Sequence, residues 1–352
     1  MITEQQVIEA LRGVKYPGYS RDIVSFGFVR RVSVSGTAVA VELECATANA
    51  AAAEQIRSEC ERAIASLPEV TAVHVELARP PTDAHQPQFS TDPWAHQRRV
   101  PGVARIIAVA SGKGGVGKTT VAVNLACALA KLGDRVGLLD SDIYGPTVPT
   151  MMGVRKLPQL NAEQRIVPLT NHGVKLMSIG FILDEDQPVI WRGPLVVRAL
   201  QQFLYEVEWG ELDWLIVDLP PGTGDVQLSL CQAVPLDGGV IVTTPQPASL
   251  AVVRKGIAMF QKLNVPVLGI VENMSYYQTP AGERVEIFGH GGGRAEAQRQ
   301  QIPFLGEVPV YTEIRIGSDH GVPVVVSEPE SAPAQPFFTI AKALRAQLNA
   351  LK

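Results

Sequence analysis

The chain has 352 residues, of which 46% are hydrophobic and 19% are charged, and its formal net charge is −4. This composition is typical of a globular protein, and the length predicts two domains. A slightly acidic chain lacks the basic field that attracts nucleic acids and anionic lipids, so we expect no nucleic-acid partner. No apolar run approaches the roughly 18 residues that span a bilayer, and the polar first residues do not resemble a signal peptide. We therefore expect a cytoplasmic protein without a membrane partner.

The cysteines of the chain are few and widely spaced: Cys45, Cys60, Cys127 and Cys231, with no C-x-x-C pair. In a chain of this size and compartment, such spacing does not indicate a disulfide framework. Cys127 and Cys231 fall in helical patterns rich in small and leucine side chains. We expect both to be small buried apolar residues.

Residues 1–78 are predicted to form a small α+β domain. Its expected elements are a helix over 4–11, a strand that alternates through residues 39–45, a helix over 50–67 and a strand over 70–77. The segment 22–29 resembles the small domain of the MIP18-like family, which is associated with iron–sulfur protein assembly. That family often carries a cysteine near Asn49 or Ala50, and none stands there. We therefore assign this domain no metal and predict an interaction module.

Residues 79–102 are predicted to link this domain to the next. The segment carries five prolines: Pro80, Pro81, Pro87, Pro93 and Pro101. Proline lacks the backbone N–H that a helix needs, so an extended linker is expected.

Residues 103–352 show the pattern of an α/β domain. Apolar runs at 106–110, 136–139, 214–218, 239–243 and 266–271 alternate with helical stretches. This order predicts a mostly parallel sheet with helices on both faces, of the P-loop NTPase kind, preceded by the small α+β domain. Ligands of such sheets bind outside the carboxyl ends of the strands, so functional residues should directly follow these runs.

A glycine-rich loop follows the first of these runs. Residues 112–119 match the phosphate-loop template G-x-x-x-x-G-K-[ST], between an apolar strand and a helical pattern. Triphosphate carries several negative charges, and glycines let many backbone N–H groups approach it closely. Lys118 is predicted to contact the phosphates and Thr119 to bind Mg²⁺. The expected ATP-binding residues of the loop are Gly112, Lys113, Gly114, Gly115, Val116, Gly117, Lys118, Thr119 and Thr120.

Lys113 adds a second lysine to the loop. The form K-G-G-x-G-K-[ST] resembles the deviant Walker A motif of the MinD, ParA, ArsA and nitrogenase-iron-protein class. In that class the extra lysine reaches the nucleotide of a partner subunit, which implies a catalytic role in trans for Lys113. The alternative is a solvated loop lysine.

Three further strand ends carry polar residues. Asp140 and Asp142 follow the run 136–139, where Asp142 is predicted to position or deprotonate the attacking water and Asp140 to support Mg²⁺. Helix-capping or turn aspartates are the alternative. Asp218 closes the run 214–218 in the Walker B arrangement, near the metal. Asn273 follows the run 266–271, and its amide has the donor and acceptor needed to read adenine.

With these motifs the chain resembles the Mrp/ApbC family of iron–sulfur cluster carrier ATPases. The resemblance rests on residues 111–120, 140–149, 191–194, 218–225, 272–276, 287–292 and 306–309. It implies a homodimer that binds ATP between its subunits and hands iron–sulfur clusters to apoproteins.

One motif of that family is missing. Family members usually carry C-P-x-C shortly after the Asn-Met-Ser-Tyr run, whereas residues 277–284 read Tyr-Gln-Thr-Pro-Ala-Gly-Glu-Arg. Two thiolates from each subunit would suit a bridging [4Fe–4S] cluster, and threonine cannot replace them. His290 is a candidate single ligand, although a structural place in its glycine-rich turn is favoured. A MinD/ParA-like positioning or regulatory ATPase without a cluster is therefore the alternative function.

The last helical pattern has one apolar face, formed by Phe337, Phe338, Ile340, Ala341, Leu344, Leu348 and Leu351. We predict that this face packs on the sheet. The alternative is an amphipathic helix that touches membranes, as in MinD.

Overall fold

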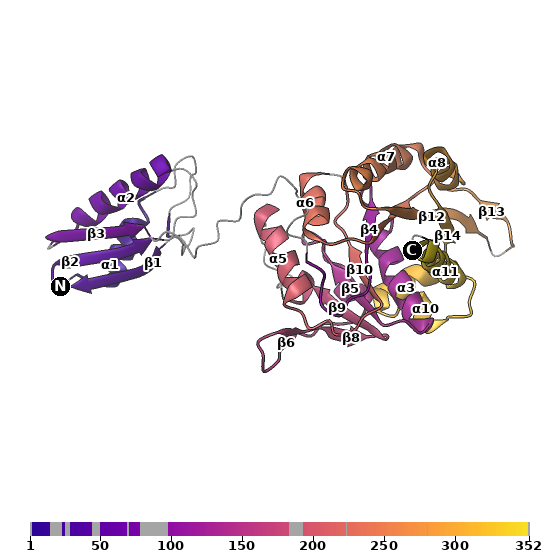
Figure 1. The fold of residues 1–352 in the computed structure, drawn as a ribbon, viewed down its shortest axis with the longest axis horizontal. Coiled ribbons are helices and arrows are strands. Elements are labelled where there is room, and N and C mark those ends of the chain that lie inside the picture. Colours follow the sequence, from indigo (N-terminus) through magenta and orange to yellow (C-terminus); the bar gives the residue numbers. More distant parts are fainter. Residues whose placement is uncertain are drawn as a thin grey trace. The chain divides into compact units, whose positions relative to one another are not determined.

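The computed structural model describes residues 2–14, 23–24, 29–43, 50–68, 70–77, 98–182, 193–222, 224–279 and 281–350 (Figure 1). It divides into two compact units, residues 1–90 and 91–352. Most of the predicted linker and the segment around Cys45 lie outside the described residues. Residues 98–102 are described, and they belong to the second unit: Val100 is buried and Arg99 pairs with Asp237 at 2.8 Å.

Within its described residues, the first unit has a three-stranded sheet and two helices. In chain order it contains α1 (Glu4–Leu11), β1 (Val29–Ser35), β2 (Ala38–Leu43), α2 (Ala50–Ala65) and β3 (Ala72–Leu77). β1 and β2 are antiparallel, whereas β2 and β3 are parallel and are joined through α2. The alternation in β2 buries Val39, Val41 and Leu43, as the sequence pattern predicts.

The second unit is built on a nine-stranded sheet. Its strands are β4 (Ile106–Ser111), β5 (Val136–Asp140), β8 (Leu169–Asn171), β9 (Val174–Ser178), β10 (Trp214–Asp218), β11 (Gly238–Thr243), β12 (Val267–Gln278), β13 (Arg284–Val285) and β14 (Phe304–Val310). A separate hairpin pairs β6 (Gln159–Leu160) with β7 (Ile166–Val167). The helices are α3 (Lys118–Lys131), α4 (Val148–Met151), the 3₁₀ turn η1 (Ile179–Phe181), α5 (Gly193–Tyr205), α6 (Asp225–Ala233), α7 (Pro247–Lys262), α8 (Gly292–Gln300), α9 (Thr312–His320), α10 (Val324–Ser327) and α11 (Gln335–Ala350).

The strand order is β13-β12-β11-β4-β10-β5-β9-β8, with β14 paired to β12. The five predicted apolar runs are β4, β5, β10, β11 and β12, and each pair of neighbours among them is parallel. Among the described strands of this sheet, β8 and β13 are the ones that pair antiparallel. The prediction of a mostly parallel sheet is therefore confirmed, and the strand carboxyl ends share one edge.

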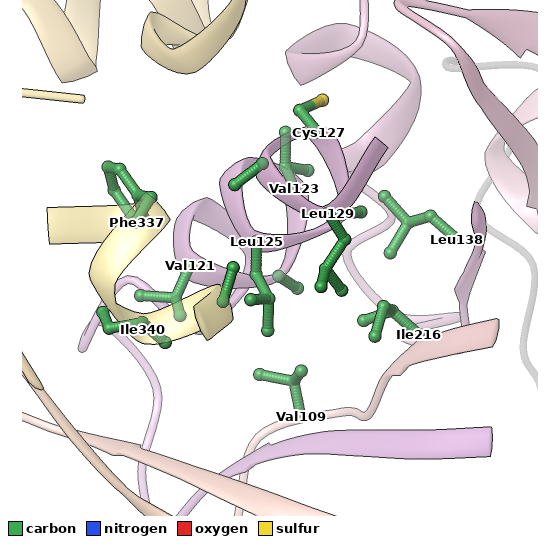
Figure 2. Packing of buried hydrophobic residues seen from close by; sticks show 14 of the residues in the cluster. Val109, Val121, Val123, Leu125, Cys127, Leu129, Leu138, Ile216, Phe337 and Ile340 are labelled. Atoms are coloured by element: carbon green, nitrogen blue, oxygen red, sulfur yellow. The ribbon is translucent and has the colours of Figure 1, made fainter. Parts of the chain in front are cut away.

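Alternate residues of the strands point to two separate apolar cores. Ile107, Val109 and Ile216 pack on one face, under helices α3, α4, α9, α10 and α11. Ile106, Ala108 and Leu215 pack on the other, under α5, α6, α7 and α8. Figure 2 shows the first core, where Val121, Leu125 and Leu129 of α3 lie between the strands and α11. The two covered faces explain why these strands are apolar throughout instead of alternating.

Helix α11 packs its apolar face against this core, beside α3 and β14, which confirms the favoured prediction for the described residues; Phe338 is half-buried, and Leu351 lies outside them. Phe337, Ile340, Ala341, Leu344 and Leu348 are buried, and Phe337 and Ile340 lie beside α3 in Figure 2. Arg345 anchors the same helix through an ion pair with Asp134. In the part of the chain that the structure describes, no helix has the length and apolarity needed to cross a membrane.

We expect Leu344→Ala to destabilise the second unit by about 2–4 kcal/mol, because it leaves a cavity at a side chain that is fully buried. Chemical denaturation followed by tryptophan fluorescence measures the change. Lys342→Ala, on the exposed side of the same helix, should stay within about 0.5 kcal/mol of wild type. Equal stability of the two variants would mean that α11 is not part of the core.

Candidate functional site

The loop between β4 and α3 has backbone geometry that only glycine adopts readily. Gly115 and Gly117 both have φ of +78°, in the left-handed region. Gly117 is the N-cap of α3 and offers no side-chain cap, so the first amides of the helix are free to bind an anion. Gly112 serves packing instead, since a Cβ there would lie 2.7 Å from the Val252 backbone of α7.

Asn273, from the middle of β12 and two strands away from β4, holds this loop. Its Nδ2 donates to the Val116 carbonyl at 2.9 Å, and a Cβ on Gly117 would overlap the same amide. Asn273 also lines the cavity described below, so the structure places it beside the predicted nucleotide site. The sequence does not predict this contact of Asn273 with the loop backbone. Hydrogen bonding of Asn273 to the adenine edge stays a prediction.

We expect Gly117→Ala to destabilise the second unit by about 1–3 kcal/mol, because the new Cβ meets Asn273 and the backbone is left-handed. The same substitution should also lower the affinity for nucleotide. Gly114→Ala is the matched control, since its Cβ would enter open space and its φ is not left-handed. Thermal unfolding of the two variants tests this, and equal melting temperatures would contradict it.

Lys118, Thr119 and Asp218 form one buried cluster at the base of the loop. Lys118 Nζ lies 2.6 Å from Asp218 Oδ1, and the Thr119 hydroxyl donates to Asp218 Oδ2 at 2.7 Å. The Lys118 side chain is 6% exposed and that of Asp218 is 0% exposed. The structure thus joins the predicted phosphate ligand to Thr119 and Asp218, two of the three predicted metal residues. A hydroxyl and a carboxylate are the hard oxygen donors that Mg²⁺ prefers, so these residues fit that ion.

Asp140 and Asp142 lie at the end of the adjacent strand but differ in surroundings. Asp140 is buried and accepts hydrogen bonds from the Ser178 hydroxyl and from the amides of Asp142 and Val148. Burial, with the nearby Asp218 charge, raises the pKa of Asp140 to about 7. Asp142 is half-buried and lines the cavity, and burial raises its pKa. A carboxylate with a raised pKa is a stronger base, which suits the role predicted for Asp142.

Lys113 lies on the α7 side of the loop. Its Nζ donates to Gln246 Oε1 at 3.3 Å, and its backbone carbonyl accepts from the Ser111 hydroxyl. Lys113 is half-buried and is not among the residues that line the cavity. A contact with a second subunit stays a prediction.

A cavity of about 670 Å³ opens above the loop. This volume lies within the range of small-molecule sites. The loop residues from Gly114 to Thr120 form its floor, with Asp142 and Asn273 at the sides. Residues of β14 and α9 also line it, and apart from Pro309 in the motif at 306–309 the sequence predicts no role for them: Pro309, Val310, Tyr311, Ile314, Arg315, Ser318 and Asp319.

The cysteines that the structure describes, Cys60, Cys127 and Cys231, are buried. Burial raises the pKa of Cys127 and of Cys231 to about 12, so neither offers a thiolate near neutral pH. These thiols do not fit an accessible iron–sulfur cluster.

A phosphate loop after a central parallel strand, with an acid at the end of the next strand, defines a P-loop nucleoside triphosphatase. A family model described as NUBPL iron-transfer P-loop NTPase matches residues 102–345. A second, described as iron-sulfur cluster assembly protein, matches residues 4–76. The chain belongs to the family of NUBPL iron-transfer P-loop NTPases.

Relatives with these names extend over most of the chain. An iron-sulfur cluster carrier protein of Synechocystis is 46% identical and covers 99% of both chains. The mouse iron-sulfur cluster transfer protein NUBPL is 50% identical over 70% of this chain and 78% of its own length. Among solved structures, an Archaeoglobus fulgidus nucleotide-binding protein in complex with ADP is 40% identical, covers 68% of this chain and 93% of that one, and has a TM-score of 0.60. The cell division ATPase MinD of Pyrococcus furiosus shares the fold. It is 24% identical, covers 69% of this chain and 99% of its own, and has a TM-score of 0.53.

Proposed function

We propose that the protein binds Mg²⁺–ATP in this cavity, hydrolyses it to ADP and phosphate, and uses the cycle to carry iron–sulfur clusters to apoproteins. The observation that carries the proposal is the cluster of Lys118, Thr119 and Asp218 beneath the unpaired amides of α3. The ADP complex of the Archaeoglobus relative supports an adenine nucleotide as the ligand.

In the proposed reaction, the loop amides and Lys118 bind the β- and γ-phosphates, and Thr119 and Asp218 hold Mg²⁺, with Asp140 supporting them through water. The bound metal supplies positive charge against the charge that develops on the phosphates. Asp142 accepts a proton from a water molecule while the oxygen of that water attacks the γ-phosphorus. The bond between the γ-phosphorus and the β–γ bridging oxygen breaks, which leaves ADP and phosphate. Lys118 Nζ has three N–H donors, of which Asp218 and Thr119 accept two, so the third can be donated to a phosphate oxygen.

The proposed active form is a homodimer in which Lys113 contacts the nucleotide of the partner subunit. The hydrogen bond to Gln246 is one that a half-buried lysine can exchange for a phosphate oxygen at little cost. Because this positive charge comes from the partner subunit, hydrolysis would be fast only when two subunits are associated.

In this proposal the iron–sulfur cluster is the cargo that the protein carries and not its resident cofactor. The names of the curated relatives support this part of the proposal. The missing C-P-x-C pair and the buried described thiols favour the second candidate, a regulatory or positioning ATPase without a cluster.

Anaerobic reconstitution with iron and sulfide separates the two candidates. A carrier should retain iron and sulfide in equal amounts, show cluster absorption and pass the cluster to an apo-ferredoxin. Single Cys→Ser variants at the four cysteine positions should then identify the ligands. Protein that retains neither iron nor sulfide but hydrolyses ATP would contradict the carrier and support the regulatory ATPase.

A further inference from the structure

Three side chains that can bind a metal ion meet beside the paired middles of β12 and β14. Glu272 comes from β12, Glu307 from β14 and His290 from the turn before α8. β12 and β14 are parallel, and Glu272 is the register partner of Glu307, so the two carboxylates lie side by side. One ligand atom from each of the three residues lies within 4.8 Å of the others.

This cluster lies on the α8 face of the sheet, opposite the face that is covered by α3 with its first residues Lys118 and Thr119. Successive residues of a strand alternate in direction. Asn273 reaches the phosphate loop, and its neighbour Glu272 therefore points to the α8 side, where it accepts from the amides of Gly291 and Gly293. A metal ion bound here is distinct from the ion expected at Thr119.

The three residues are held in place by their surroundings. His290 Nε2 lies 2.9 Å from Glu307 Oε2, and its ring meets Tyr276 edge-on at 5.8 Å. Glu272 is fully buried, and within the described residues it has only amide donors and no cationic partner. A buried carboxylate without a counter-charge gains more from a bound cation than an exposed one does.

The cluster is accessible from solvent, and Arg284 pairs with one of its carboxylates. His290 and Glu307 are each 26% exposed, so an ion can reach them from solvent. Arg284 stacks on Tyr276 and lies 3.4 Å from the second oxygen of Glu307, which leaves Oε2 facing His290. Arg284 thus partly offsets the charge of Glu307, while the carboxylate of Glu286 lies 3.8 Å from His290 Nδ1.

We propose that Glu272, His290 and Glu307 bind one divalent transition-metal ion, with water completing its coordination. One imidazole and two carboxylates suit Zn²⁺, Mn²⁺ or Fe²⁺. The set contains no thiolate, the ligand that iron–sulfur clusters prefer, so this is a site for a single ion. The proposal does not depend on nucleotide hydrolysis.

Calorimetric titration of the chelator-treated full chain with Zn²⁺, without nucleotide or Mg²⁺, tests the site. Wild type should bind one more Zn²⁺ per chain than His290→Gln, or bind it at least about tenfold more tightly. Loss of a residue that only supports a metal ligand already weakens metal binding about tenfold or more, and loss of a direct ligand should weaken it at least as much. Glu307→Gln should have the same effect. Arg284→Gln should bind Zn²⁺ more tightly than wild type, because a repelling charge is removed. His74→Gln, an exposed histidine on β3, is the matched control and should bind as wild type does.

Co²⁺ absorption provides a second readout that a structural role would not change. The visible bands of Co²⁺ in wild type should lose intensity in His290→Gln and persist in His74→Gln. Thermal unfolding of each variant without metal checks that the fold is intact. Equal Zn²⁺ stoichiometry and affinity in wild type, His290→Gln and Glu307→Gln would overturn the proposal.

Discussion

Lys118→Ala should lose nucleotide binding, with the affinity for Mg²⁺–ATP falling at least about 100-fold. The variant removes a charge-assisted hydrogen bond to phosphate, worth up to about 3 kcal/mol, together with the attraction of the lysine charge for the other phosphate oxygens, and about 1.4 kcal/mol corresponds to a tenfold change. Titration with a fluorescent ATP analogue measures the effect. An affinity within tenfold of wild type would contradict the role proposed for Lys118.

The same substitution also has a structural effect that must be separated from binding. Asp218 is fully buried, and without Lys118 it keeps only the Thr119 hydroxyl as a side-chain partner among those described. Breaking a buried ion pair by removing one partner costs about 3–5 kcal/mol. The double variant Lys118→Ala with Asp218→Asn removes both charges and should regain part of this stability. Because Asp218 is itself a proposed Mg²⁺ ligand, binding in the double variant is measured with ATP without Mg²⁺, at a temperature where it is folded, and its loss then reports on Lys118.

Lys113→Ala should keep ATP binding and lose hydrolysis by about 10³-fold or more, as expected for a cation that acts mainly on the transition state. Steady-state phosphate release measures the rate, and the analogue titration measures the affinity. Gln246→Ala is the matched control: it removes the hydrogen-bond partner of Lys113 but keeps the charge, so it should retain activity. Equal hydrolysis rates for Lys113→Ala and wild type would exclude the proposed role.

Mixed dimers show whether Lys113 acts within its own subunit or across the interface. A dimer of one Lys113→Ala subunit and one Lys118→Ala subunit has a single site with an intact Lys118. In trans, that site receives Lys113 from the partner, and about half of the wild-type activity should return. An inactive mixed dimer would mean that both lysines must belong to one chain.

The architecture of the second unit follows from local patterns. Apolar strands such as β4 and β10 are buried on both faces, which makes them visible as continuous runs. The loop at 112–119 is contiguous in sequence, so its position after β4 could be predicted as well. The helical spacing of apolar residues in α11 is also a local pattern, and it predicts that this face packs in the core.

Contacts between distant segments were not predictable. The bond from Asn273 to Val116 depends on the position of β12 relative to α3, which no sequence pattern reports. The cavity lining around Tyr311 and Arg315 depends on how α9 follows β14. Glu272 and Glu307 are 35 positions apart and meet through strand register alone. The interface that Lys113 is proposed to cross belongs to a second chain and stays a prediction.

The most direct test of the account is calorimetric titration of the full chain with ATP in the presence of Mg²⁺. The account predicts one nucleotide bound per chain, and binding that requires both Lys118 and an unsubstituted Gly117. No uptake of ATP or ADP by folded protein would contradict it, because the loop, the cavity and the Lys118–Asp218 pair would then have no ligand.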